Sequence, residues 1–259
     1  MFTVEQRDAL RERMLTLGEA DERVVAGAIV GSLAVDGGGD RYSDLDMTFG
    51  ISGDAAVADV LDHWTRTLLD ELEAVQLADL QRGSTTYRVF LLPEGLQFDL
   101  SMTPAAQFRP AGPRFRLVFG EMAEDGSETP TSANPGGLVI PTPPVAEAIF
   151  GWGVIYALHS RACIERGRVW QAEHYVGAVR DHALALACLR EGLPPAQART
   201  YDDLSAETVA RYEDAHVGSV DPEELRTALA ASVRPLVREG VEARLAHAAV
   251  VAERVAELR

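Results

Sequence analysis

The chain has little cysteine and no long apolar run. Its two cysteines, Cys163 and Cys188, lie in apolar patterns of helical period and have no neighbour at metal-ligand spacing. We therefore expect buried free thiols rather than a cysteine-ligated metal. No apolar run approaches membrane-spanning length, and the N-terminal stretch MFTVEQRDALRERM lacks the apolar core of a signal peptide. These absences predict a cytoplasmic protein without a membrane partner.

Cationic side chains are also scarce. Lys and Arg number 24 against 40 Asp and Glu, so the formal net charge is −16 and the pI is near 4.8. Proteins that bind nucleic acid use cationic side chains to displace counterions from the phosphates, so a nucleic-acid partner is disfavoured. An acidic protein would instead attract a polycationic small molecule.

The remaining composition is that of an ordinary globular protein. Hydrophobic residues make up 47% of the chain and charged residues 25%. The 259 residues are enough for two modest domains, each with its own core. The segment 124–144, EDGSETPTSANPGGLVIPTPP, is rich in Gly, Pro, Ser and Thr and has no hydrophobic period. We therefore expect one domain over residues 1–135 and a second over residues 141–259.

The first domain is expected to be a mixed sheet covered by helices. Thr3 and Gln6 have the spacing of a capping box, which predicts the start of a helix. Pro93-Glu94-Gly95 separates two strand-like runs and predicts the turn of a hairpin. The predicted elements are a helix ending near residue 19, strands over 24–30 and 44–51, a helix over 55–74, and strands over 85–92, 96–102 and 115–119.

The second domain is expected to be entirely helical. Residues 145–166 and 168–190 have the pattern of two long helices, and Ser205 is expected to cap a third. Asp221 followed by Pro222 and two glutamates is a strong helix start, and the last segment, to Arg259, is expected to be helical throughout. The predicted fold class is therefore α/β (α+β), a mixed-sheet domain followed by an all-helical C-terminal domain.

The most informative stretch of the chain is GAIVGSLAVDGGGDRYSDLDMTFG. Asp44 and Asp46 lie two residues apart on a predicted strand, so their side chains point to the same face. Two carboxylates on one rigid face repel each other unless a cation lies between them. Mg²⁺ usually takes one or two protein carboxylates and completes its shell with water and substrate phosphates, so this pair predicts a Mg²⁺ site.

The ordered series of motifs resembles the nucleotidyltransferase superfamily, whose best-known member is DNA polymerase beta. Its pattern is a strand ending in Gly-Ser, a loop, Asp-x-Asp on the next strand, and a third carboxylate on a later strand. Asp99, between the apolar Phe98 and Leu100 on the second arm of the predicted hairpin, is the candidate for that carboxylate. The resemblance covers roughly residues 1–120 and looks closest to the small-molecule branch, which includes the aminoglycoside and lincosamide nucleotidyltransferases.

The resemblance implies a role for each residue of the series. Asp44 and Asp46 would hold the Mg²⁺ that binds a nucleoside triphosphate. Asp99 would complete a second metal site beside the attacking hydroxyl, or would take the proton of that hydroxyl directly, and the sequence leaves both roles open. The backbone amides of Gly31 and Ser32, with the Ser32 hydroxyl, would cradle the leaving phosphates.

Two loop residues are further candidates for nucleotide binding. Arg41 is placed to add a charge-assisted contact to the phosphates, and Ser43 is placed to add a hydroxyl donor. The alternative for Arg41 is a solvated loop arginine.

Acceptor recognition is expected in the cleft between the two domains. Trp170, Glu173 and Asp181, together with His174 and Arg180, fall on one face of a predicted helix. An aromatic ring and carboxylates could bind an amino sugar, and the alternative is a polar face that is simply solvated.

The leading hypothesis is a Mg²⁺-dependent nucleotidyltransferase that moves AMP from ATP onto a hydroxyl of a small molecule. By resemblance, an aminoglycoside or lincosamide antibiotic is the natural acceptor, which would make antibiotic resistance the biological role. The alternatives are an adenylyltransferase that modifies a protein side chain and a non-enzymatic, antitoxin-like binding module. The long second domain and the complete set of three aspartates argue against the binding module. The residues favour neither a monomer nor a homodimer.

Overall fold

The computed structural model describes residues 2–110, 112–123, 146–195 and 198–258. The chain divides into two compact units, Met1–Ile140 and Pro141–Arg259, and each is described by itself. The domain boundary expected within 124–144 lies outside the described residues. No helix in these described ranges is long and apolar enough to cross a membrane.

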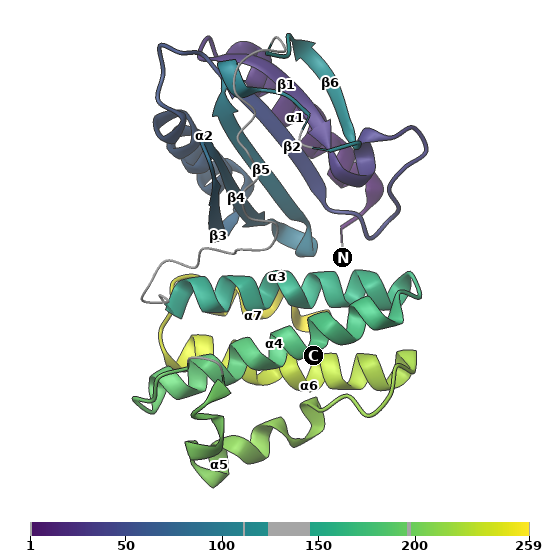
Figure 1. Cartoon of the computed structure of the whole chain (residues 1–259), viewed down its shortest axis with the longest axis vertical. Coiled ribbons are helices and arrows are strands. Elements are labelled where there is room, and N and C mark those ends of the chain that lie inside the picture. Colours follow the sequence, from purple (N-terminus) through teal and green to yellow (C-terminus); the bar gives the residue numbers. More distant parts are fainter. Residues whose placement is uncertain (1, 111, 124–145, 196–197, 259) are drawn as a thin grey trace. The chain divides into compact units, whose positions relative to one another are not determined.

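A six-stranded mixed sheet forms the centre of the first unit (Figure 1), in the order β3-β4-β5-β2-β1-β6. β2 and β5 are parallel, and the other neighbouring strands are antiparallel. This sheet and the helical second unit confirm the predicted fold class. The strands are β1 (Val24–Val30), β2 (Leu45–Ile51), β3 (Val75–Arg82), β4 (Thr85–Leu91), β5 (Gln97–Pro104) and β6 (Phe115–Gly120).

The core of the first unit lies between the sheet and the helices α1 (Val4–Ala20) and α2 (Val57–Leu72). Alternate residues of β2 and β5 enter this core, among them Leu45, Met47 and Leu100, which are fully buried. Because strand side chains alternate, Asp46 and Asp99 project from the opposite face of the same two strands. Burial of the apolar side chains in the core therefore determines that Asp46 and Asp99 point to the other face of the sheet.

Several local predictions are confirmed. Thr3 and Gln6 form the capping box that starts α1, and Pro93–Gly95 turns the antiparallel hairpin of β4 and β5. Both cysteines are buried and free. The sequence analysis did not predict the strand β3, which pairs with β4 at the edge of the sheet. A bulge between Gln76 and Ala78 interrupts its hydrophobic alternation, which is the signal that predicts a strand.

The described residues of the second unit are largely helical. Gly167 (φ +67°) separates α3 from α4, and Asp221 caps α6 by accepting hydrogen bonds from the amides of Glu223 and Glu224. Ser205 caps only the short α5, which continues as the 3-10 helix η6 (Ala210–Ala215). The helices are α3 (Ala146–Glu165), α4 (Val169–Arg190), α5 (Ala206–Val209), α6 (Pro222–Glu242) and α7 (Ala248–Arg254).

The expectation of uninterrupted helix toward the C-terminus is wrong. The helix α6 ends at Glu242, and α7 begins at Ala248. Arg244 and His247 both have positive φ in the intervening turn, at 54° and 64°. Neither is a glycine, so the sequence carries no sign of this break.

Candidate active site

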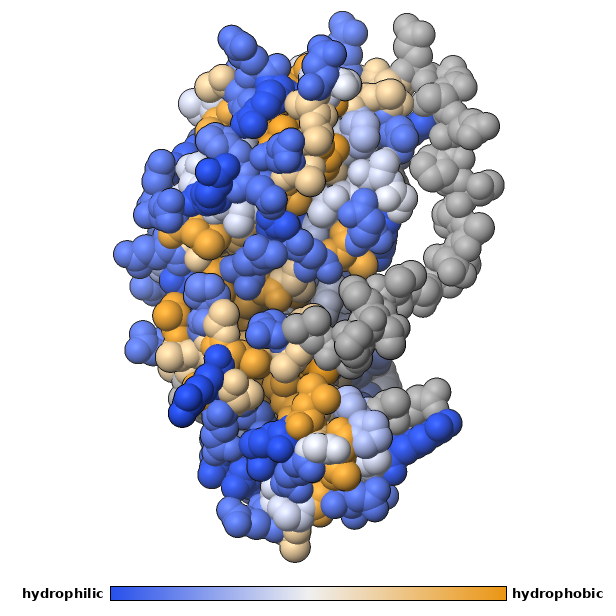
Figure 2. Space-filling model, turned by 90° about the vertical axis from the view of Figure 1, so that its left-hand side faces the viewer, coloured by the Kyte–Doolittle hydropathy of each residue, from blue (hydrophilic) through white to orange (hydrophobic). Residues whose placement is uncertain are grey.

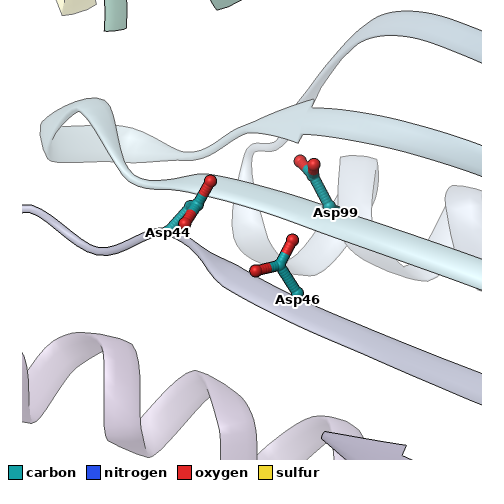
Figure 3. Close-up of side chains that lie close together, drawn as sticks. All are labelled: Asp44, Asp46 and Asp99. Carbon is teal, nitrogen blue, oxygen red and sulfur yellow. The ribbon is translucent and has the colours of Figure 1, made fainter. Parts of the chain in front are cut away.

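Asp44, Asp46 and Asp99 form a carboxylate cluster in the first unit. Asp46 and Asp99 are register partners on the parallel strands β2 and β5, and Asp44 directly precedes β2. Each side chain offers one ligand oxygen, and these atoms all lie within 4.8 Å of one another. Figure 3 shows the three side chains on the same side of the two strands. The structure thus brings together the three aspartates selected from the sequence.

The cluster is electrostatically costly when all three carboxylates are charged. Burial, followed by the charges of Asp44 and Asp99, raises the pKa of Asp46 well above its ordinary value. Burial, with the charge of Asp44, raises the pKa of Asp99 to about 7, although a hydrogen bond from Gln97 acts in the opposite direction. A bound cation would favour the charged forms, so this donor set suits a hard divalent metal ion such as Mg²⁺.

Gly31 lies directly against the carboxylate cluster. It begins the 3-10 turn η1 (Gly31–Ala34), which follows β1, and its φ is +68°. A Cβ at this position would lie 2.2 Å from Oδ2 of Asp46. Glycine is therefore required here both for its backbone conformation and for the space it leaves beside the carboxylate.

Ser32 carries an unused polar group next to Gly31. Its Oγ is buried and makes no hydrogen bond with any described residue. A buried hydroxyl without a partner is costly, and a bound ligand would remove that cost. The Gly31 amide, by contrast, donates to the carbonyl of Arg114 at 3.2 Å. Of the groups expected to cradle phosphates, the Gly31 amide is therefore engaged within the protein, and the Ser32 hydroxyl is buried without a partner among the described residues.

The loop candidates Arg41 and Ser43 are engaged with their neighbours. The Ser43 hydroxyl accepts from the Asp40 amide at 2.9 Å and lies 3.2 Å from the Asp40 carboxylate, to which it donates. The Arg41 guanidinium lies over the Tyr42 ring, 4.5 Å from its centroid. Ser43 is buried and Arg41 is exposed. These contacts shape the loop that leads into Asp44.

Three residues that the sequence analysis did not select support the cluster. Arg7 of α1 is only 4% exposed and donates to the carbonyls of Asp40 and Ser43 at 2.6 and 3.2 Å, which fixes the loop before Asp44. Gln97 donates to Asp99 at 2.9 Å and orients its carboxylate. Arg116 of β6 donates to the carbonyl of Leu33 at 3.2 Å and so holds η1. Arg7 and Arg116 act across elements distant in sequence, and no local pattern marks them. Gln97 lies two residues before Asp99 on the same strand, so strand alternation could have placed it on the face of that carboxylate.

The acceptor candidates lie on α4 in the second unit. Trp170 is 75% exposed and Glu173 is half-buried. Asp181 is exposed but accepts hydrogen bonds from the neighbouring Arg180 at 2.9 and 3.1 Å. The opposite side of this helix, with Ala172, is buried, as its pattern predicts.

Comparisons with known proteins give matches among solved structures only. No protein-family model matches the chain, and no curated protein is similar to it in sequence. Among solved structures, the chain is similar to an aminoglycoside 6-adenyltransferase from Bacillus subtilis, with 11% sequence identity over 95% of this chain and 90% of that chain, and a TM-score of 0.29. A similarity this low says nothing about activity, so the candidate site rests on its own geometry.

Proposed function

We propose that the chain is a Mg²⁺-dependent nucleotidyltransferase that moves AMP from ATP onto a hydroxyl of a small molecule. The observation that carries this proposal is the carboxylate cluster of Asp44, Asp46 and Asp99. Three carboxylates within 4.8 Å, on a rigid sheet and with raised pKa values at two of them, are arranged to hold a divalent cation. The resemblance of the surrounding motifs to nucleotidyltransferases supplies the reaction class.

The aspartates would hold the metal and activate the acceptor. When bound, Mg²⁺ neutralises the charge that develops on the phosphate oxygens. Asp44 and Asp46 would ligate the ion that the triphosphate also binds. Asp99, oriented by Gln97, would take the proton of the acceptor hydroxyl. The acceptor oxygen forms a bond to the α-phosphorus, the bond from that phosphorus to the β-phosphate oxygen breaks, and pyrophosphate leaves with the electron pair.

The turn after β1 would bind the triphosphate. Gly31 leaves the space beside Asp46 through which a phosphate can approach, and the buried Ser32 hydroxyl can donate to a phosphate oxygen. The loop that Arg7 fixes would hold Asp44 in place during the reaction. Gly31, Ser32 and Arg7 would thus bind the triphosphate and position Asp44, while the aspartates would hold the metal and take the proton.

The acceptor we propose is a cationic amino sugar or a lincosamide. The net charge of −16 favours a cationic ligand, and the exposed Trp170 with Glu173 offers an aromatic face and a carboxylate on α4. Asp181 would contribute less to acceptor binding, because Arg180 already pairs with it. The reaction would take place in the cytoplasm, where ATP and Mg²⁺ are supplied.

The proposal is tested by measuring pyrophosphate release with Mg²⁺ and each of the four common nucleoside triphosphates. Aminoglycosides, lincosamides and plain buffer serve as acceptors, and Asp44→Asn and Asp46→Asn are the test variants. Asp70→Asn removes one charge from the exposed surface of α2 and is the matched control.

We expect release that depends on an acceptor, that falls at least a hundredfold in both test variants, and that is unchanged in Asp70→Asn. Near-normal release in either test variant would refute the metal assignment. Release that depends on an added protein instead of a small molecule would favour the protein-modifying alternative. Absence of release, combined with tight co-purification of a partner protein, would favour the binding module.

A further inference from the structure

A pocket in the helical unit is lined mainly by arginine. Its volume is about 210 Å³, and it lies where η6 packs against α6. The carboxylate cluster belongs to the other unit, so the pocket is a separate feature of the chain. The lining residues are Arg211 and Asp214 of η6 and Ala231, Arg234, Pro235 and Arg238 of α6.

The positions on α6 explain how the pocket forms. Arg234 and Arg238 are four residues apart, so they project from the same face of the helix, one turn from each other. Ala231 and Pro235 lie on the same face of α6, are buried, and supply the apolar part of the lining. Arg211 reaches the pocket from η6.

Acidic side chains hold two of these arginines and leave part of each guanidinium unused. Arg238 donates its Nε to Glu242 at 2.7 Å, and Arg211 donates its Nη2 to Glu207 at 2.9 Å. Arg234 donates its Nε to the Ala230 carbonyl of its own helix at 3.2 Å. Within the described part of the chain, the terminal amino groups of Arg234 and Arg238 make no hydrogen bond, although Arg238 is ion-paired with Glu242.

Arg211 adds a buried donor. Its Nη1 is buried and makes no hydrogen bond to the described residues, and its nearest ion-pair partner, Glu239, is 3.7 Å away. A buried guanidinium donor without an acceptor is costly. An oxyanion in the pocket would accept from the amino groups of Arg234 and Arg238, and Arg211 would add its positive charge.

The charge of the lining also points to an anion. The chain contains no lysine, so all 24 of its Lys and Arg residues are arginines, and three of them meet at this pocket beside a single aspartate. Glu207 and Glu242 pair with two of these arginines, but a cluster of three arginines still stands out in a chain with a net charge of −16. Guanidinium groups present paired donors that match phosphate oxygens. The volume is below the ~300 Å³ typical of pockets for drug-sized ligands, which favours a small group.

We propose that this pocket is a binding site for a phosphate group, held by Arg211, Arg234 and Arg238. The site is independent of the carboxylate cluster and of its metal. It would bind free inorganic phosphate or the phosphate of a small phosphorylated molecule, since both present the same oxygens to the arginines.

The test is isothermal titration of the full chain with inorganic phosphate, at low ionic strength and with a chelator present. The chelator removes divalent metal, so a response from the carboxylate cluster is avoided. A second titration with glycerol 3-phosphate distinguishes a site for the free ion from one for a phosphomonoester. The test variants are Arg234→Gln combined with Arg238→Gln, and Arg211→Gln alone. Arg168→Gln, an exposed arginine outside the pocket, is the matched control.

We expect binding of at least one of the two phosphates, at least tenfold weaker in the double variant and in Arg211→Gln, and unchanged in Arg168→Gln. The thermal unfolding of the double variant should match that of the unaltered chain, because Arg234 and Arg238 are exposed. Equal affinity in the variants, or no binding of either phosphate by the unaltered chain at millimolar concentration, would overturn the proposal. Asp44→Asn should bind phosphate normally, and a loss of binding there would also overturn it.

Discussion

Gly31 shows how one residue connects the backbone to the carboxylate cluster. Its positive φ and its contact with Asp46 each exclude a side chain. Gly37 offers a matched control, because it has the same φ of +68° but no atom within 4 Å of an added Cβ. The pair therefore separates the cost of the backbone conformation from the cost of crowding Asp46.

We predict that Gly31→Ala and Gly37→Ala each lose about 1–2 kcal/mol of unfolding free energy from the left-handed conformation. Gly31→Ala should lose more than Gly37→Ala, because the new methyl group must displace Asp46, and it alone should abolish pyrophosphate release. Urea unfolding and the release assay measure these effects. Equal stability and equal activity of the two variants would show that the space beside Asp46 is unimportant.

The buried aspartates make the stability of the metal-free protein depend on pH. Asp99 has a pKa of about 7, and the pKa of Asp46 is also raised, whereas both are near 4 in an unfolded chain. Between about pH 4 and 7 the folded protein holds protons that the unfolded chain releases, so this contribution to stability grows as the pH falls. Above about pH 7 the Asp99 carboxylate is charged, and its burial and its repulsion with Asp44 destabilise the fold.

We predict that Asp99→Asn is more stable than the unaltered chain at about pH 8 without metal, by roughly 2 kcal/mol, and that the difference shrinks toward pH 5. Asparagine keeps an oxygen that can accept from Gln97, so the hydrogen bond at this position survives. Urea unfolding in the presence of a chelator, at both pH values, gives the two differences. A variant that is less stable at pH 8, or a difference independent of pH, would contradict this account of the cluster.

At the scale of elements, the sequence predicted the strands that carry the aspartates but not their pairing. The hydrophobic alternation of β2 and β5 predicted that Asp46 and Asp99 point to the face of their strands opposite the core. Their direct opposition depends on parallel pairing of two strands that are separated by α2 and a hairpin, and no local pattern specifies such a register. Arg7 was missed for a related reason, because its burial depends on a loop more than thirty residues away.

In the helical unit, Arg190 of α4 forms ion pairs with two glutamates of α6, Glu239 at 2.7 Å and Glu242 at 3.6 Å. Arg190 donates to both carboxylate oxygens of Glu239, at 2.7 and 3.1 Å, and Glu239 is 1% exposed. The arginine on its own looks like a surface residue at the end of a helix, so the sequence did not reveal the pair. Without Arg190, the buried charge of Glu239 would face only Arg211, 3.7 Å away, which does not replace the two short hydrogen bonds.

We predict that Arg190→Met destabilises the helical unit by about 3 kcal/mol. The matched control is Arg226→Met, whose ion pairs with Glu223 and Glu165 lie nearer the surface and should cost less than about 1 kcal/mol. Urea unfolding followed by circular dichroism compares the two variants. Similar losses in both would mean that the burial of Glu239 does not matter.

At the scale of the whole molecule, the chain has a large excess of acidic residues over basic ones. Hydrophilic residues predominate on the face drawn in Figure 2, and hydrophobic residues appear between them in patches. The net charge of −16 creates a field that attracts cations and is screened by salt. This expectation follows from composition alone and needs no knowledge of the fold.

We predict that the KM for a polycationic acceptor rises several-fold between about 50 and 500 mM NaCl, because salt screens the attraction that brings the acceptor to the protein. The kcat should change much less, since the aspartates act at short range. Steady-state kinetics at the two salt concentrations separate the two parameters. A neutral acceptor serves as control, and an equal rise of its KM would rule out attraction by the net charge as the cause.

The most direct test of the central claim is a titration of Mn²⁺, as a paramagnetic substitute for Mg²⁺, into the protein and a non-hydrolysable ATP analogue. Free Mn²⁺ is followed by electron paramagnetic resonance, and the binding curve of the analogue alone is subtracted. The account predicts that the unaltered chain and Asp70→Asn remove Mn²⁺ from solution, and that Asp46→Asn binds it at least tenfold more weakly. Equal binding by Asp46→Asn and Asp70→Asn would show that the carboxylate cluster is not a metal site.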